Sequence, residues 1–170
     1  SVNHPRGIAV DEKHVYVTDT GNSRILKLTL TGQFVSHFGR VGKDPGQFSH
    51  PLGIAVWDGK LYIADVGNRR IQVLTTEGEH VKSYPVTGWE GEVFNEPYVA
   101  VTPDNMIWYT DPNRGMVISM NQDGAIVKGY DKDSTSRPFG LPMGLGVDSS
   151  GHILVVDARN HKVQMIKREN

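Results

Sequence analysis

Val15-Tyr-Val-Thr-Asp19 is a short run of β-branched and aromatic residues that ends in an aspartate, and the chain repeats this pattern three more times. The other copies are Leu61-Tyr-Ile-Ala-Asp65, Ile107-Trp-Tyr-Thr-Asp111 and Ile153-Leu-Val-Val-Asp157, so successive aspartates stand 46 residues apart. A proline lies 14 residues before the aspartate in the first three copies and 15 before it in the fourth, at Pro5, Pro51, Pro97 and Pro142. A unit of this length cannot bury its own apolar faces and must stack on its neighbours. The spacing therefore predicts a repeat protein with four units.

Each unit reads as four short strands. In the first unit, small residues after the proline predict an innermost strand at 7–10, and the run 15–19 predicts a second strand. The alternating run 25–28 predicts a third strand, and the turn Thr31-Gly32 leads to a fourth at 34–38, because glycine supplies the positive φ of a tight hairpin. No 11-residue window keeps an apolar stripe of helical period.

Four antiparallel strands in 46 residues are typical of one blade of a β-propeller. The sequence therefore predicts an all-β propeller domain over residues 1–170, with blades at about 4–49, 50–95, 96–140 and 141–170. The fourth unit reaches Asn170 before any fourth strand, so we expect the last blade to be incomplete.

Three motifs of the first unit resemble the NHL repeat: Pro5-Arg-Gly-Ile-Ala-Val10, Val15-Tyr-Val-Thr-Asp-Thr-Gly-Asn-Ser-Arg-Ile25 and Pro45-Gly-Gln-Phe48. The second unit fits as closely, whereas the third lacks the glycine after Pro97, and the fourth has Ala158-Arg159 in place of Thr-Gly. The resemblance implies an NHL-type β-propeller, a family whose rings usually have about six blades. Four units then imply part of a larger ring, an open arc or a compact four-bladed form. Unless the ring closes at four blades, we expect self-association through exposed blade faces.

Charge and composition exclude several classes of function. The formal net charge is −1, so the whole chain has no bulk attraction for nucleic acid or anionic lipid. Without cysteine, the chain has no disulfides and no thiolate metal ligands. No apolar run is long enough to span a bilayer, and we expect neither a membrane partner nor a cofactor. The sequence does not encode a compartment, and the cytoplasm is our working expectation.

The aspartate that ends the second strand recurs in every unit, which favours a structural role because catalysis needs one asymmetric site. Each copy precedes a turn such as Thr20-Gly21-Asn22, where a carboxylate can accept backbone N–H groups. In the first two units an arginine follows five residues later and can pair with the aspartate across the turn. We interpret the following residues as parts of structural turns: Asp19, Asp65, Asp111, Asp157, Arg24 and Arg70.

Blade topology places the loop that enters the first strand and the loop between the second and third strands at the same end of every blade. This end collects basic residues, whereas the opposite end collects acidic ones, including Asp11, Glu12, Asp58, Glu77 and Glu79. Loops on a rigid propeller are free to vary and commonly bind partners. The predicted binding face consists of Arg6, Arg69, Tyr98, Arg114 and Arg159, and the long loop 85–95 is expected to add Trp89 to it.

Guanidinium groups beside aromatic rings suit protein hot spots, acidic peptides or single-stranded RNA. The sequence therefore predicts a non-catalytic binding module that presents a loop face to a protein or RNA. In animal NHL proteins of the ubiquitin-ligase type, such propellers recognise substrates or RNA, and the resemblance implies that this role is open to the chain. A purely structural or extracellular interaction domain is a third possibility.

An enzyme is the alternative, because amidating lyases of the NHL-like superfamily are similar in strand pattern. His4 and His50 each precede a repeat proline and could share a metal between adjacent blades, but Glu96 and Leu141 stand at the equivalent positions of the other two units. The chain has no Gly-x-Ser-x-Gly, His-Glu-x-x-His or P-loop motif. We therefore expect no metal and keep a metal-assisted lyase or hydrolase as the alternative.

Overall fold

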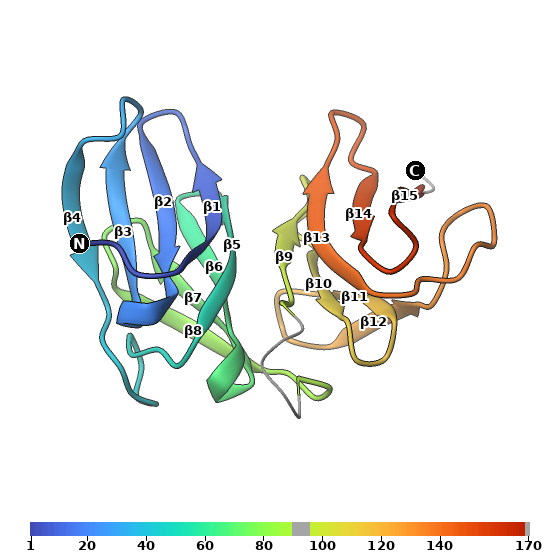
Figure 1. The fold of residues 1–170 in the computed structure, drawn as a ribbon, viewed down its shortest axis with the longest axis horizontal. Helices are drawn as coiled ribbons and strands as arrows, with labels where there is room; N and C mark the ends of the chain where they lie inside the picture. The colour runs from blue at the N-terminus through green and yellow to red at the C-terminus, as the bar shows by residue number, and fades with distance from the viewer. Residues whose placement is uncertain (90–95, 169–170) are drawn as a thin grey trace. The chain divides into compact units, whose positions relative to one another are not determined.

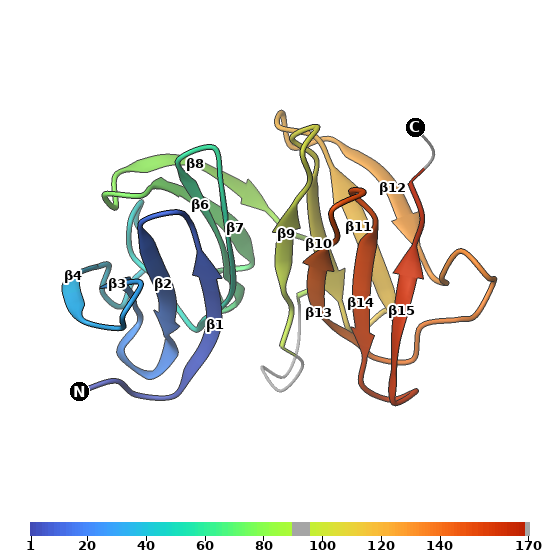
Figure 2. The same cartoon turned by 90° about the horizontal axis from the view of Figure 1, so that it is seen from above.

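The computed structural model describes residues 1–89 and 96–168. The chain divides into two compact units, Ser1–Thr87 and Gly88–Asn170, and each unit contains two antiparallel β-sheets. Figures 1 and 2 show the strands of each sheet side by side in the order of the chain. No helix in the described part of the chain is long and apolar enough to cross a membrane.

Two four-stranded sheets form the first unit. The first sheet contains β1 (Pro5–Val10), β2 (His14–Asp19), β3 (Arg24–Thr29) and β4 (Phe34–Phe38). The second contains β5 (Pro51–Trp57), β6 (Lys60–Asp65), β7 (Arg70–Thr75) and β8 (His80–Pro85). A single 3-10 turn follows the second strand of each sheet, η1 at Thr20–Asn22 and η2 at Val66–Asn68.

The second unit repeats this plan. One sheet contains β9 (Val99–Val101), β10 (Ile107–Asp111), β11 (Met116–Met120) and β12 (Ile126–Tyr130). The other has three strands, β13 (Pro142–Val147), β14 (Ile153–Asp157) and β15 (Lys162–Ile166). The prediction of an all-β fold with four propeller blades, the last of them incomplete, is confirmed. The blade boundaries themselves stay predictions.

Glycine and threonine bring the innermost strands of the first two blades together. The Thr18 hydroxyl donates to the carbonyl of Leu52 on β5 at 2.7 Å and accepts the N–H of Gly7 on β1 at 2.7 Å. A Cβ atom added at Gly7 would lie 2.4 Å from the same Leu52 carbonyl oxygen. Only glycine permits this approach at position 7, which explains why a glycine follows the repeat proline by two residues in the first blade.

The described residues form a hydrophobic core in each unit, and these two cores use equivalent positions. In the first unit, Tyr16, Ile25 and Phe48 of the first blade pack on residues of the second blade, namely Ile54, Leu61, Ile63 and Leu74. In the second unit, Trp108, Val117 and Phe139 pack on the last blade, on Leu145, Ile153, Val155 and Ile166. Positions 16 and 108, and positions 25 and 117, differ by two repeats of 46 residues. We call the sheet face that packs on the following blade the forward face, and the face that packs on the preceding blade the backward face.

The outer edge of the three-stranded sheet is partly covered by the loop that precedes it. The Ser134 N–H donates to the Met165 carbonyl on β15 at 3.0 Å, and the Ser134 hydroxyl accepts the Lys167 N–H at 2.6 Å. Asp133 holds this loop in shape by accepting the N–H groups of Thr135 and Arg137. The last blade has three strands, and this loop makes hydrogen bonds along the edge where a fourth strand would pair.

Candidate functional site

The recurring aspartates lie where the second strand of each blade enters its turn, and all four are fully buried. Asp19 accepts hydrogen bonds from the Asn3 N–H at 2.7 Å, the Asn22 amide at 2.8 Å and the Arg24 Nε at 2.7 Å. Burial alone would raise the pKa of Asp19, but the hydrogen bonds from Asn22, Asn3 and Arg24 outweigh it and lower the pKa.

Asp65 repeats this arrangement in the second blade. It accepts the Ser49 N–H at 2.7 Å, the Asn68 amide at 2.8 Å and the Arg70 Nε at 2.8 Å. Burial raises the pKa of Asp65 despite the equivalent set of donors. The remaining Arg70 nitrogens donate to the carbonyls of loop residues 43, 44 and 47, so this arginine is fully engaged in the fold.

Asp157 uses other donors in the last blade. It accepts the N–H groups of Gly140 and Leu141 at 2.9 and 2.8 Å, and the side-chain amides of Asn160 and Gln164 at 2.7 and 2.9 Å. Burial alone would raise the pKa of Asp157, but these hydrogen bonds outweigh it and lower the pKa. Gln164 thus supplies a donor in a blade that has no arginine five residues after the aspartate.

Asp111 differs from the other three. Its Oδ1 accepts the Arg114 N–H at 3.2 Å, while Oδ2 has no hydrogen-bond partner among the described residues. The Arg114 Nε lies 3.6 Å from Oδ2, and the Arg114 side chain is half exposed. In this blade, Met116 occupies the position that Arg24 and Arg70 hold in the first two blades. Burial raises the pKa of Asp111.

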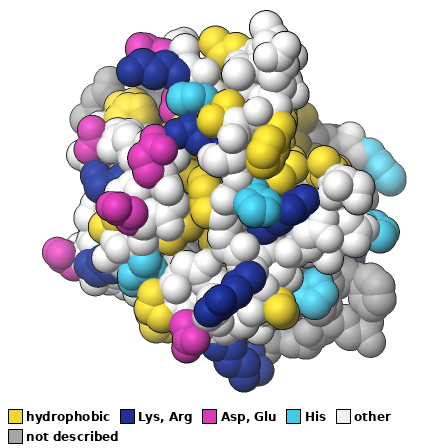
Figure 3. All heavy atoms as spheres, turned by 90° about the vertical axis from the view of Figure 1, so that its left-hand side faces the viewer, with side chains coloured by type: hydrophobic (Ala, Val, Ile, Leu, Met, Phe, Trp, Pro, Cys, Tyr) yellow, Lys and Arg dark blue, Asp and Glu magenta, His cyan; other side chains and the backbone are white. Residues whose placement is uncertain are grey.

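The predicted face residues of the first unit are Arg6 and Arg69, and both are exposed. Arg69 follows η2 with a left-handed φ of 52°, and its carbonyl accepts the Val86 N–H at 2.8 Å, so its backbone is fixed. An open depression of about 360 Å³ lies beside it, lined by Lys43, Gly67, Asn68, Arg69 and Arg70. On the side of the molecule seen in Figure 3, basic and acidic side chains are interspersed.

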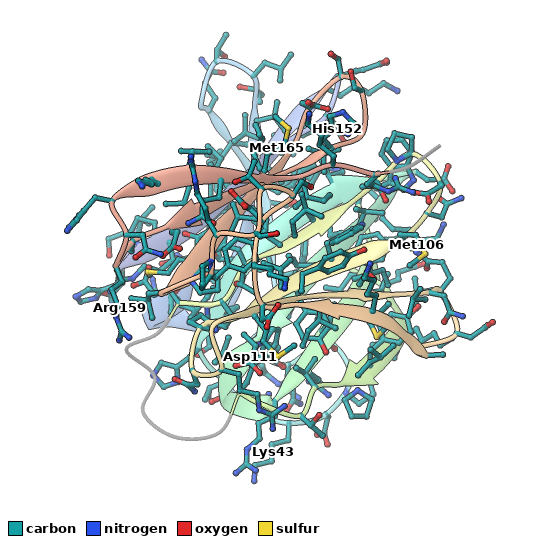
Figure 4. All side chains as sticks on the ribbon, turned by 90° about the vertical axis from the view of Figure 1, so that its right-hand side faces the viewer. Lys43, Met106, Asp111, His152, Arg159 and Met165 are labelled. Carbon is teal, nitrogen blue, oxygen red and sulfur yellow. The ribbon has the colours of Figure 1, made fainter. Side chains whose placement is uncertain are left out.

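The predicted face residues of the second unit are Tyr98, Arg114 and Arg159. Arg114 and Arg159 are exposed, and Figure 4 shows Arg159 extending outward from the turn after β14. Tyr98 is half-buried, and its N–H donates to the Thr110 hydroxyl at 2.8 Å. The two arginines and the tyrosine come from three different loops of this unit.

Trp89 does not lie on a binding face, and that prediction is wrong. Its side chain is buried, its indole N–H donates to the Thr110 carbonyl at 2.9 Å, and its ring meets that of Tyr109 edge-on at 5.7 Å. A large aromatic ring with a satisfied N–H is more stable in a core than in water. The rest of the expected loop, residues 90–95, lies outside the described residues.

His4 and His50 occupy equivalent corners, each exposed and with a left-handed φ of 48° or 53°. His4 Nδ1 lies 2.6 Å from the Asn3 side-chain oxygen. Within residues 1–89 and 96–168, no group of three or more His, Asp or Glu side chains could hold a metal ion.

The opposite end of the first unit contains a hollow that the sequence did not reveal. It has a volume of about 610 Å³, and its lining includes Asp11, Tyr16, Trp57 and Glu77. The Tyr16 hydroxyl donates to Asp11 at 3.0 Å, and burial raises the Tyr16 pKa. The buried Lys27 reaches Glu77 of the next blade at 2.6 Å. Acidic residues in two hairpin turns were the only signal for this hollow.

Comparison with known proteins identifies the repeat. The NHL repeat matches residues 2–28, 48–74 and 139–165. The chain contains NHL repeats. The predicted resemblance is thereby confirmed, and the unit that departs most in sequence, the third, lies outside the matching segments.

Several solved propellers are similar in structure to this NHL chain. They include streptogramin B lyase (19% identity, TM-score 0.68, covering 95% of this chain and 53% of that one) and nidogen in complex with laminin (24%, 0.74, 97% and 61%). The glutaminyl cyclase of Myxococcus xanthus is 15% identical with a TM-score of 0.66, covering 96% of this chain and 72% of that one. All three identities are below 25% and show the fold alone. The chain spans about half to three-fifths of the length of the first two, and no curated protein matches it.

Proposed function

We propose that this chain is a non-catalytic, protein-binding NHL module that uses exposed arginines at the loop ends of its blades. The observation that carries the proposal is the division of the arginines into two classes. Arg24 and Arg70 donate to buried aspartates and to backbone carbonyls, so they stiffen the loop ends. Arg69 stands on one of these turns, Arg6 lies at the start of β1, and Arg114 and Arg159 lie in the corresponding turns of the second unit; all four are exposed.

A protein partner is favoured over single-stranded RNA. Arg24 and Arg70 are committed to aspartates, which leaves fewer cations at the loop ends to follow a phosphate backbone. Separate arginines suit bidentate contacts with carboxylates on a protein surface. One similar propeller, that of nidogen, forms a complex with the protein laminin, which supports this use of the fold.

Binding of a fluorescein-labelled, glutamate-rich peptide and of a labelled oligouridylate tests the proposal by fluorescence anisotropy. We expect the wild type to bind the peptide with an affinity that falls as salt rises, and Arg69→Glu/Arg114→Glu to weaken this binding at least tenfold. Glu79→Lys is the matched control, because Glu79 is exposed at the opposite end.

Equal peptide binding by the double variant and the wild type would contradict the arginine face. Stronger binding of the oligouridylate than of the peptide would favour an RNA partner. Glu77 is unsuitable as a control, because its reversal would place a second positive charge beside the buried Lys27.

A further inference from the structure

We propose that the hollow lined by Asp11, Tyr16 and Trp57 binds an alkyl cation, that is, a guanidinium or primary ammonium group on a methylene stem. The hollow has a volume of about 610 Å³, which is within the range of sites for small ligands. It lies at the opposite end of the first unit from Arg69. The proposal therefore does not rest on the function proposed above.

The hollow lies inside the first unit, where the forward face of the first blade meets the backward face of the second. Tyr16 of the first blade is fully buried in the core, and Val56 of the second blade packs against the same core. Glu77, also in the lining, is held at 2.6 Å by Lys27 of the first blade, whose side chain is only 5% exposed. The packing of the two blades thus fixes the walls, and the site is formed before any ligand arrives.

Asp11 is a carboxylate that the fold holds in place in this lining. Its Oδ1 accepts the N–H groups of Lys13 and His14 at 2.8 and 2.7 Å, and its Oδ2 accepts the Tyr16 hydroxyl at 3.0 Å. Burial alone would raise the pKa of Asp11, but these hydrogen bonds outweigh it and lower the pKa, so the group is ionised at neutral pH. A carboxylate fixed in this way loses little freedom when it binds a cation.

The pair of Asp11 and Tyr16 is not part of the repeated scaffold. The tyrosine recurs in the second blade as Tyr62, but Trp57 stands there at the position of Asp11. The hollow therefore receives a carboxylate from one hairpin and an indole ring from the same position of the next. Residues that serve only the propeller fold recur at the 46-residue spacing, as the turn aspartates do, whereas this combination belongs to one junction.

The charges of the lining favour a cation. The lining has four carboxylates and one lysine: Asp11, Glu12, Asp58, Glu77 and Lys13. Among the described residues, two of the carboxylates are neutralised by lysines outside the lining, Glu77 by Lys27 and Asp58 by Lys60. With His14 counted as neutral, Asp11 and Glu12 leave the hollow with an excess of negative charge over Lys13.

The apolar part of the lining suits a methylene stem. Val56 and the half-buried Trp57 lie at the end of β5 and provide this surface. Lysine and arginine bury their stems along such surfaces while the charged group finds a polar partner. A guanidinium can also stack on an indole ring, and an ammonium is attracted to its face. A basic side chain of a peptide and a small organic cation both have this chemistry.

An NMR titration that follows the indole N–H signal of Trp57 tests the site, with Trp57→Phe identifying the signal. The probe is a blocked alanine pentapeptide with a central arginine. The matched probe has citrulline at the centre, which keeps the shape of arginine and removes its charge. We expect the arginine peptide to shift the Trp57 signal with an affinity that falls as salt rises, and the citrulline peptide to leave the signal in place.

Three variants separate the site from a general effect on folding. Asp11→Asn should weaken binding about tenfold, because the asparagine oxygen can still accept the N–H groups of the turn but has no charge. Asp148→Asn is the matched control, since Asp148 accepts two N–H groups in the turn after β13, in the second unit. Lys13→Gln should strengthen binding about threefold by removing the lysine of the lining, and a gain in affinity cannot come from unfolding.

Butylguanidinium, titrated in the same way, distinguishes the two sources of the cation. Tighter binding of the peptide supports the site with a basic side chain of a peptide as its ligand, and equal binding supports it with a small organic cation. Equal shifts with the arginine and citrulline peptides would overturn the proposal. So would a Trp57 signal that no probe moves, or a folded Asp11→Asn variant that keeps the full affinity.

Discussion

The carboxylates of Asp65 and Asp111 stand at the same place in successive repeats, yet their surroundings differ. Asp65 has a hydrogen-bond donor on each oxygen and an arginine partner, whereas Oδ2 of Asp111 has no hydrogen-bond partner among the described residues. Both side chains are fully buried. Burial raises the pKa of both carboxyls, but the described residues offset the cost of burying the charge more fully at Asp65 than at Asp111.

Asp65→Asn and Asp111→Asn form a matched pair of substitutions. We expect Asp65→Asn to lower the free energy of unfolding by about 3 kcal/mol, because it leaves the partly buried Arg70 without its counter-charge. Asp111→Asn should change it by less than about 1 kcal/mol, since it removes a buried charge that has few partners among the described residues. Urea unfolding followed by tryptophan fluorescence measures both, and equal losses would contradict the distinction.

The pH dependence of Asp19 and Asp111 should have opposite signs. The pKa of Asp19 lies below the ordinary value of 3.8, so its contribution to stability is present above pH 3.8 and is lost as pH falls through the folded-state pKa. The pKa of Asp111 lies above 3.8, so its contribution is full below pH 3.8 and is lost as pH rises through the folded-state pKa.

Urea unfolding at several pH values between 3 and 7 checks both signs. The stability deficit of Asp19→Asn relative to wild type should shrink toward pH 3. The stability of Asp111→Asn relative to wild type should improve as pH rises from 4 to 7. A relative stability of Asp111→Asn that does not vary with pH would show that its carboxyl titrates alike in the folded and unfolded states.

At the scale of residues, the sequence predicted contacts that are local and repeated, and missed those that are distant. A spacing of five residues across a turn placed Arg24 beside Asp19 correctly. No local pattern places Lys27 beside Glu77, fifty residues away. The prediction for Trp89 was wrong because the local sequence around a tryptophan does not tell whether its side chain faces solvent or packs in the core.

The blades depend on close contact between innermost strands, and Gly7 is the residue that allows it. Gly7→Ala would place a methyl group 2.4 Å from the backbone oxygen of Leu52, which cannot move without disturbing β5. We expect a loss of about 3 kcal/mol in the free energy of unfolding. Gly146→Ala is the control, because its nearest neighbour, the Leu154 Cβ, lies 4.0 Å away, and a substantial loss there would point to a general cost of side chains in innermost strands.

The ion pair between β3 and the turn after β7 should respond asymmetrically to substitution. Glu77→Gln leaves the Lys27 ammonium, with a side chain only 5% exposed, without a counter-charge. Lys27→Met leaves a carboxylate whose side chain is 73% exposed and stays hydrated, and Met165 already occupies the equivalent position in the last blade. Thermal unfolding should show a larger loss of Tm for Glu77→Gln than for Lys27→Met, and the reverse order would contradict this account.

At the scale of elements, the strands were predictable because their apolar pattern and glycine turns repeat four times. The 46-residue spacing predicted the strands of all four blades. It also predicted that the last sheet has three strands in the described residues. The hollow lined by Asp11, Tyr16 and Trp57 was not predictable, because its shape depends on how two neighbouring hairpins diverge.

The stability of the whole molecule should not depend on a metal. In the part of the chain that the structure describes, no three acidic or histidine side chains gather closely enough to hold one. We expect the Tm to be the same with EDTA as with added zinc. A Tm raised by zinc in the wild type but not in His4→Ala/His50→Ala would instead support the metal-assisted enzyme alternative.

The hydrogen bonds of Ser134 bear on the tendency of this protein to aggregate. An open strand edge is a template on which other chains can add strands and begin to aggregate. By occupying the Met165 carbonyl and the Lys167 N–H, Ser134 closes two of the hydrogen-bonding positions along the edge of β15. We therefore expect the loop 131–138 to hinder the addition of further strands at this edge, although it contributes no strand itself.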